Sequence, residues 1–230
     1  EPGAFAGLEE SLEVLDLKCN KILLSTIECG SFAHMSKLTR LNLSSTDLIS
    51  FKSIGKSSIS FETLDGLFCV EELLMASMKI SSIGTNSFFQ LKNLRLLDLR
   101  YNKIRVLEPG AFNWLVSLEE LLLANNLLRM VDADTFVYMK KLRCLDLKNN
   151  EIAWVSSNAF RGLDCLERLN LGENRLDKLK ANTFCELKHL THLDLGQNRL
   201  ESISSLAFSK LHNLACLSLK ANMISVIEPG

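Results

Sequence analysis

The sequence has few of the residues that break or loosen regular structure, with only three prolines and eleven glycines among 230 residues. This scarcity excludes a flexible linker or a low-complexity segment. No stretch approaches the roughly 18 consecutive uncharged apolar residues of a membrane-spanning helix. The net charge of −1 favours neither a nucleic acid nor an acidic membrane as a partner, so the bulk charge leaves the ligand class open.

Sequence motifs of catalysis are also missing. The chain has no G-x-S-x-G, P-loop, G-x-G-x-x-G or H-E-x-x-H motif. Its seven cysteines form no C-x-x-C pair, which disfavours a small zinc site. For the cysteines we expect structural, partly buried thiols. They are Cys19, Cys29, Cys69, Cys144, Cys165, Cys185 and Cys216. We therefore predict a protein that is not an enzyme and that holds no metal and no cofactor.

Hydrophobic residues make up 47% of the chain, and they recur with a fixed period. The unit reads L-x-x-L-x-L-x-x-N-x-L-x-x-I-x-x-x-x-F-x-x-L-x-x, and offsets are counted from its first residue. Self-similarity at a period of this length is typical of a repeat architecture. The last seven copies follow one another at intervals of 24 residues, and all copies start at Leu12, Leu38, Val70, Leu94, Leu118, Leu142, Leu166, Leu190 and Leu214.

Each unit predicts one short strand, because the apolar residues at offsets three and five, such as Leu145 and Leu147, alternate with polar ones. Stacked units then form a parallel sheet, and later residues such as Val155 and Phe160 fill the core from the outer side. The predicted fold is an α/β solenoid: a leucine-rich-repeat horseshoe with the sheet on its concave face and irregular or short 3-10 segments on its convex face. We expect one array of about nine repeats over residues 1–230.

Two recurring residues have specific structural roles. Asparagine at offset eight is expected to bridge the backbone of neighbouring repeats, since a buried amide must be hydrogen-bonded. Thr46 and Met78 replace it in two repeats, and we expect this asparagine ladder to break at Met78. Phenylalanine at offset eighteen is expected to form a spine inside the core. The asparagines are Asn20, Asn102, Asn126, Asn150, Asn174, Asn198 and Asn222, and the regularly spaced phenylalanines are Phe88, Phe112, Phe136, Phe160, Phe184 and Phe208.

Two features depart from the regular pattern. The second repeat, from Leu38 to Val70, spans 32 residues, and its Ser-, Gly- and Lys-rich segment 51–63 predicts an inserted, projecting loop. Such a loop either carries binding contacts or is a tolerated insertion, and the sequence leaves both interpretations open. The chain also begins and ends inside repeats without polar caps, so we expect an internal part of a longer array, truncated at both ends.

The 24-residue unit resembles the typical leucine-rich repeat of animal extracellular proteins. Long uncapped runs of this unit, interrupted by an irregular copy such as residues 38–67, look like the ectodomains of Toll-like receptors, and the stretch LTRLNLS at residues 38–44 is similar to that family. The resemblance implies an innate immune receptor that binds a microbial product and dimerises with a second receptor chain to signal. It also implies a location on the extracellular or endosomal-lumen side of a single-pass membrane protein. An extracellular adhesion or guidance protein that binds another cell-surface protein is the alternative.

The charge pattern distinguishes two surfaces. Offsets two, four and six, on the predicted concave face, carry six basic and six acidic side chains. This balance does not indicate a nucleic acid ligand, although it does not exclude one. At offsets nine, eleven and twelve, just after the strands, eight basic residues oppose four acidic ones. In Toll-like receptors this side is often the ligand or dimer face, and by that resemblance we predict an interaction face. A solvated edge with scattered charge is the alternative. The candidate residues are Lys79, Lys103, Arg105, Arg129, Arg175, Lys178 and Arg199.

Two further features concern the concave face. Asn42-Leu43-Ser44 is the single N-x-S/T sequon, and we predict glycosylation at Asn42, at offset four, with an unused chance sequon as the alternative. His192 lies two residues before Asp194, a pair that can titrate in an acidified compartment, although an ordinary surface histidine is the favoured interpretation.

Overall fold

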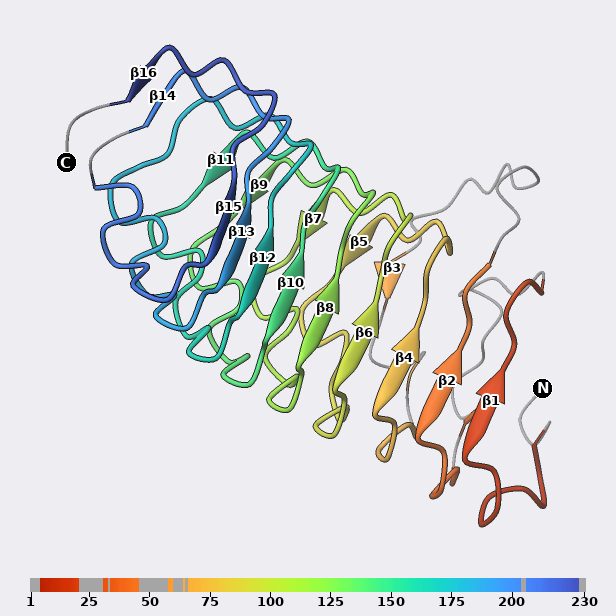
Figure 1. Cartoon of the computed structure of the whole chain (residues 1–230). Coiled ribbons are helices and arrows are strands. Elements are labelled where there is room, and N and C mark those ends of the chain that lie inside the picture. Colours follow the sequence, from red (N-terminus) through yellow and green to blue (C-terminus); the bar gives the residue numbers. More distant parts are fainter. Residues whose placement is uncertain are drawn as a thin grey trace.

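The computed structural model describes residues 5–20, 31–32, 34–45, 58–59, 64, 66–203 and 206–227. Within these residues a nine-stranded parallel sheet runs along the whole molecule (Figure 1), in the order β1-β2-β4-β6-β8-β10-β12-β13-β15. Its strands are β1 (Val14–Asp16), β2 (Arg40–Asn42), β4 (Glu72–Leu74), β6 (Leu96–Asp98), β8 (Glu120–Leu122), β10 (Cys144–Asp146), β12 (Arg168–Asn170), β13 (His192–Asp194) and β15 (Cys216–Ser218).

The register of the sheet follows the repeat. The leucine at offset three of one unit pairs with the same residue of the next, as Leu97 does with Leu121 and Leu145 does with Leu169. These four leucines point into the core and are at most 2% exposed, while strand neighbours such as Arg168 face outward. The alternation that predicts a half-buried strand therefore fixes which side of the sheet covers the core.

The return path of each repeat lies in a second layer, opposite the main sheet (Figure 1). In the described residues it consists mostly of turns, with short strands paired into three small parallel sheets. The predicted leucine-rich-repeat solenoid is confirmed, and turns and two-residue strands occupy the side where irregular or short 3-10 segments were expected. The short strands are β3 (Ser58–Ile59), β5 (Ser82–Ile83) and β7 (Val106–Leu107); β9 (Met130–Val131) and β11 (Trp154–Val155); and β14 (Ser202–Ile203) and β16 (Val226–Ile227).

The asparagine ladder is continuous over six consecutive repeats. Asn150 is typical: its Nδ2 donates to the carbonyl oxygens of Leu123 and Leu147 at 3.1 and 3.0 Å, and its Oδ1 accepts the N–H of Leu128 at 3.0 Å. Each ladder residue thus joins its own repeat to the preceding one. As expected, Met78 does not take part and packs into the hydrophobic core at 8% exposure. The same pattern holds for Asn102, Asn126, Asn174, Asn198 and Asn222.

The residue just before the ladder position has a left-handed backbone in most repeats, although none of these residues is glycine. The positive φ turns the chain at the end of each main-sheet strand and aims the following asparagine inward. A left-handed non-glycine residue is strained unless its surroundings hold it, and here most of these residues donate their N–H to a carbonyl oxygen of the next repeat, as Ser77 does to Arg100 at 2.9 Å. The residues are Cys19, Ser77, Tyr101, Asn125, Asn149, Glu173, Gln197 and Ala221, with φ between 49° and 62°.

The predicted phenylalanine spine belongs to the core, with five of the six rings buried and Phe208 half-buried at its end. Phe88, Phe112 and Phe136 stack at centroid distances of 5.9 and 6.1 Å, and Phe160, Phe184 and Phe208 form a second stack with spacings of 5.8 and 6.2 Å. Burying each ring contributes about 2 kcal/mol or more to the hydrophobic stabilisation.

The predicted loop at 51–63 lies outside the described residues, apart from the two residues of β3. There, Ser58 and Ile59 pair in parallel with Ser82 and Ile83 of β5. This irregular repeat therefore contributes to the return-path layer in the same manner as its neighbours.

Candidate interaction face

The predicted interaction face consists of side chains that follow the main-sheet strands, and we call this surface the ascending edge. The chain leaves the sheet through the left-handed turn and the ladder asparagine, so the residues immediately afterwards face outward. Six of the seven predicted residues are exposed, and Lys79 is half-buried. The ascending edge comprises Lys79, Lys103, Arg105, Arg129, Arg175, Lys178 and Arg199.

A carboxylate partly neutralises the middle of the ascending edge. Glu151 accepts from Nε of Arg129 at 3.3 Å and from Nη2 of Arg175 at 2.7 Å, and so links three neighbouring repeats. Its side chain is 25% exposed, whereas that of Arg129 is 70% exposed. The structure thus brings two of the predicted cations together, and it leaves Arg105 exposed one repeat away. Exposed ion pairs of this kind contribute about 1 kcal/mol or less to stability.

A row of exposed apolar side chains runs beside these cations, and we call it the apolar strip. Val106, Met130 and Trp154, at offset twelve of three successive repeats, are 55%, 47% and 41% exposed. Met130 and Trp154 are direct neighbours in the β9–β11 pair, and Nζ of Lys180 lies 3.7 Å from the Trp154 ring centroid. Charge counting missed this strip, but three large apolar residues in succession at offset twelve, where other copies have Ser50, Ser82, Lys178 and Ser202, would have signalled it.

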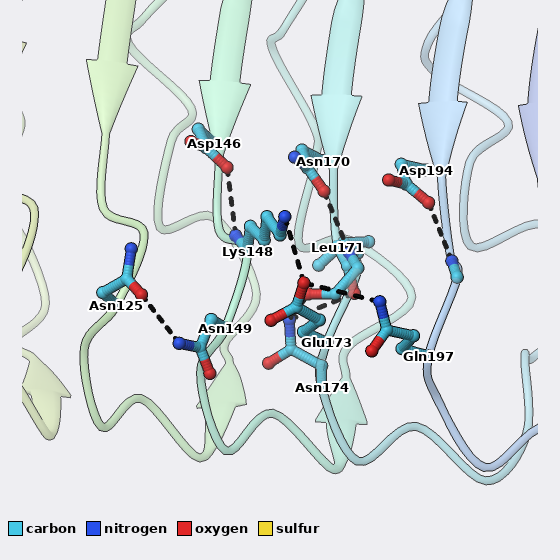
Figure 2. A network of polar contacts seen from close by, with 12 residues as sticks. Asn125, Asp146, Lys148, Asn149, Asn170, Leu171, Glu173, Asn174, Asp194 and Gln197 are labelled. Atoms are coloured by element: carbon cyan, nitrogen blue, oxygen red, sulfur yellow. Dashed lines mark hydrogen bonds and ion pairs between the residues drawn. The ribbon is translucent and has the colours of Figure 1, made fainter. Parts of the chain in front are cut away.

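On the concave face the structure pairs some of the predicted charges and leaves others apart. Arg40 bonds Glu72 at 2.6 Å, and Arg100 bonds Asp98 at 2.8 Å. Lys148 turns away from Asp146 and bonds Glu173 at 3.0 Å, as Figure 2 shows. This face is therefore a mixture of opposite charges, as the sequence predicts.

A row of alternating charges at offset one, before the strands, was not anticipated from the sequence. Arg95 bonds Glu119 at 2.9 Å, and Arg143 bonds Glu167 at 2.6 Å. The hydrogen bond from Arg95 lowers the pKa of Glu119. Because these charges satisfy one another across neighbouring repeats, this edge offers no excess of either sign to a ligand.

The predicted glycosylation site lies at the end of β2. Asn42 is only 7% exposed, and its Oδ1 accepts the N–H of Ser44 at 3.1 Å. A glycan on Nδ2 requires this side chain to turn outward. Glycosylation of Asn42 stays a prediction. The prediction is wrong if enzymatic deglycosylation leaves the intact mass of the secreted chain unchanged.

The remaining candidate groups are dispersed. His192 is exposed, and its Nδ1 lies 2.9 Å from Oγ1 of Thr191. The described cysteines are free thiols, of which Cys19, Cys165 and Cys216 are exposed, not partly buried as predicted. Among the described residues, no group of three or more His, Cys, Asp or Glu side chains is arranged to hold a metal ion. In the same part of the chain, no helix has the length and apolarity to cross a membrane.

The chain is similar to known repeat proteins. The family model of the leucine-rich repeat matches residues 1–48, 70–128, 116–176 and 166–224, which leaves out the irregular part of the second repeat. Toll-like receptor 4 of Equus caballus is 38% identical over 109 residues, covering 46% of this chain and 12% of that protein.

Two solved structures share the fold over most of the chain. Toll-like receptor 13 in complex with a single-stranded RNA has a TM-score of 0.76 and 32% identity, covering 96% of this chain and 34% of the receptor chain. A leucine-rich-repeat protein of Leptospira interrogans has a TM-score of 0.76 and 25% identity, covering 96% of this chain and 52% of its own. The chain thus spans only part of the length of each relative. It belongs to the leucine-rich-repeat family and resembles the ectodomains of Toll-like receptors.

Proposed function

We propose that this chain is part of the ligand-recognition ectodomain of a Toll-like innate immune receptor, which binds a microbial product and dimerises with a second receptor chain to signal. The observation that supports it most is the similarity to Toll-like receptors in both sequence and structure, over 46% and 96% of the chain. In this proposal the chain has no catalytic role, and it lies on the extracellular or endosomal-lumen side of a membrane-anchored protein.

The ascending edge is the proposed ligand or dimer face. Its support is the combination of exposed cations with the adjoining apolar strip, because interfaces combine apolar anchors with a charged rim. Arg105 and Arg129 directly precede Val106 and Met130 in the chain, so cation and anchor come from the same repeat. Glu151 forms ion pairs with both Arg129 and Arg175 and so joins two of these cations in the middle of the face.

Reversing the charge of Arg105, Arg129 and Arg175 to glutamate is expected to weaken ligand binding at least tenfold and to abolish ligand-dependent dimerisation. At positions 129 and 175 the new carboxylates also repel Glu151, which removes the bridge between the repeats. The measurement is surface plasmon resonance of the chain against fractionated bacterial RNA, lipid, polysaccharide and protein. Sedimentation velocity with the binding fraction then gives the oligomeric state.

The matched control carries the same charge change on the outer return path, where Lys140, Lys188 and Lys210 are exposed and become glutamate. This variant is expected to bind and dimerise normally. If the two triple variants behave alike, the ascending edge is not the interaction face. If no bacterial fraction binds the unaltered chain, the receptor function itself is contradicted.

The alternative is an extracellular adhesion or guidance protein that binds another cell-surface protein. The similarity to a Leptospira leucine-rich-repeat protein supports keeping this alternative, since this fold is not confined to Toll-like receptors. The sequence that adjoins this chain in the whole protein distinguishes the two. A membrane helix followed by a Toll/interleukin-receptor domain supports the receptor, whereas immunoglobulin modules support the adhesion protein.

A further inference from the structure

A groove of about 630 Å³ lies on the return path, where the short strands β7 and β9 end. Three successive repeats line it: Leu107 and Asn113 come from the first, Asp132 and Tyr138 from the second, and Arg161 from the third. Its volume lies within the range of about 300–1,000 Å³ that is typical of small-molecule sites. The groove therefore has the size of a site for a small molecule or for the end of a larger one.

Two glycines leave space at positions where an adjacent repeat carries a side chain. Gly110 occupies offset sixteen, which holds Asp134 in the next repeat. A Cβ on Gly110 would lie 3.0 Å from Nδ2 of Asn113, so a larger residue there would crowd this amide. Gly162 occupies offset twenty in the repeat that follows Tyr138, so no side chain from the equivalent position covers the Tyr138 ring.

The ring of Tyr138 is the apolar platform of the groove. Tyr138 is 53% exposed. Trp114, at the same offset one repeat earlier, is instead partly covered, because Phe89 meets it edge to face at a centroid distance of 4.8 Å and Nζ of Lys92 lies 5.5 Å from the centre of its ring. The face of an aromatic ring carries partial negative charge, which attracts polarised C–H groups. The structure thus leaves Tyr138 available for a ligand that stacks on it.

The polar groups around this ring both donate and accept hydrogen bonds. Asn113 and Asp132 are exposed, and Oγ1 of Thr135 donates to the carbonyl oxygen of Asp132 at 3.0 Å, which holds the turn that carries this residue. The Asp132 carboxylate accepts, and the Asn113 amide both donates and accepts. On the third repeat, Nη1 of Arg161 lies 3.4 Å from Oδ1 of Asp134 and forms an ion pair with it.

The charges of the groove favour a neutral ligand. The lining contains as many cations as carboxylates, and Arg161 is already paired with Asp134. A phosphate or sulfate group needs an excess of positive charge, which this lining does not offer. A lipid chain needs predominantly apolar walls, whereas polar side chains surround Tyr138 and Leu107 here. A saccharide fits both the ring and the polar groups, because its C–H groups stack on an aromatic face and its hydroxyl groups donate and accept hydrogen bonds.

We propose that this groove binds a neutral pyranose ring of a saccharide. The sugar stacks on Tyr138, and its hydroxyl groups bond the carboxylate of Asp132 and the amide of Asn113. The ion pair of Asp134 and Arg161 borders the bound sugar. These side chains are not those of the ascending edge, and the saccharide site does not depend on the receptor function proposed above.

The test applies the labelled 230-residue chain to an array of neutral and acidic glycans from bacterial and animal sources. Isothermal titration calorimetry then gives the Kd of each bound glycan in its free form. Tyr138→Ala is expected to weaken the binding of neutral glycans about tenfold or more, since it removes the stacking surface. Tyr101→Ala is the matched control, because Tyr101 is the second tyrosine of the chain, is 57% exposed and lies outside the groove. The Kd of this control is expected to stay unchanged.

Asp132→Asn keeps the size of the side chain, removes its charge, and is expected to weaken binding about threefold or more. Asp132 and Tyr138 are both exposed, so both variants are expected to fold. The triple charge reversal of Arg105, Arg129 and Arg175 is expected to leave the Kd for a neutral glycan unchanged, which separates this groove from the ascending edge.

The array also distinguishes the source of the sugar, since neutral glycans from bacteria and from animals both support the proposal. The proposal is overturned if no neutral glycan binds, or if acidic glycans alone bind. It is also overturned if Tyr138→Ala and Asp132→Asn bind neutral glycans as well as Tyr101→Ala does.

Discussion

Replacing Asn150 with alanine is expected to lower the free energy of unfolding by about 3 kcal/mol. The substitution removes the hydrogen bonds to the carbonyls of Leu123 and Leu147, and it leaves the buried N–H of Leu128 without the acceptor that it has now. An unsatisfied buried group alone costs about 1–3 kcal/mol, and the lost bonds to the two carbonyls add to this. Urea denaturation followed by circular dichroism measures the change.

The adjacent asparagine provides the control. Asn149 is exposed, donates to Oδ1 of Asn125 at 2.7 Å, and has a φ of 49° that glycine tolerates. Asn149→Gly is therefore expected to cost less than about 1 kcal/mol, since an exposed side-chain bond contributes little. Equal losses for the two variants would show that the ladder does not hold the repeats together as described.

Replacing Gly162 with alanine is expected to destabilise the chain by about 2–4 kcal/mol. Gly162 has a φ of 84°, and an added Cβ would lie 2.3 Å from the carbonyl oxygen of Val137, in the preceding repeat. The obstacle is backbone, so relief requires the two repeats to move apart. The left-handed conformation adds a further cost of about 1 kcal/mol. The midpoint of urea unfolding reports the sum.

Gly7 separates the two contributions, because its φ is 89° and an added Cβ would meet nothing within 4 Å. Gly7→Ala is expected to cost only the conformational part, about 1 kcal/mol. If Gly162→Ala costs no more than Gly7→Ala, the close approach of the repeats at Val137 is not a constraint on the fold.

The period of the leucines was sufficient to predict the main sheet, because a residue at the same offset in each unit must meet its equivalent in the next. The roles of Asn150 and Phe160 followed for the same reason, since a buried amide needs partners and a buried ring needs neighbours. The left-handed backbone at Tyr101 or Glu173 was not predictable. Neither residue favours this conformation by itself, and each is held by a backbone hydrogen bond to the next repeat, from Tyr101 N–H to Ala124 and from Glu173 N–H to Gly196.

The candidate site was only partly accessible to sequence reasoning. The offsets placed Arg129 and Arg175 on one edge, but they did not reveal that Glu151 binds both. The same limit applies to Lys148, whose ammonium group bonds Glu173 while its backbone N–H bonds Asp146. Such choices depend on side-chain conformations and on the spacing between repeats, which a linear pattern does not encode.

Disulfide trapping tests most directly the central claim that successive units lie side by side in register. Cys144 pairs with Glu120 on the neighbouring strand β8, whereas Leu96 lies one strand further away on β6. A disulfide needs Cα atoms about 4.4–6.8 Å apart, which adjacent strands at about 4.8 Å satisfy and strands two intervals apart do not. The account predicts that mild oxidation links Glu120→Cys to Cys144, seen by peptide mass mapping, and leaves Leu96→Cys unlinked to it. A link from Leu96→Cys to Cys144, or none from Glu120→Cys, would contradict the stacked arrangement.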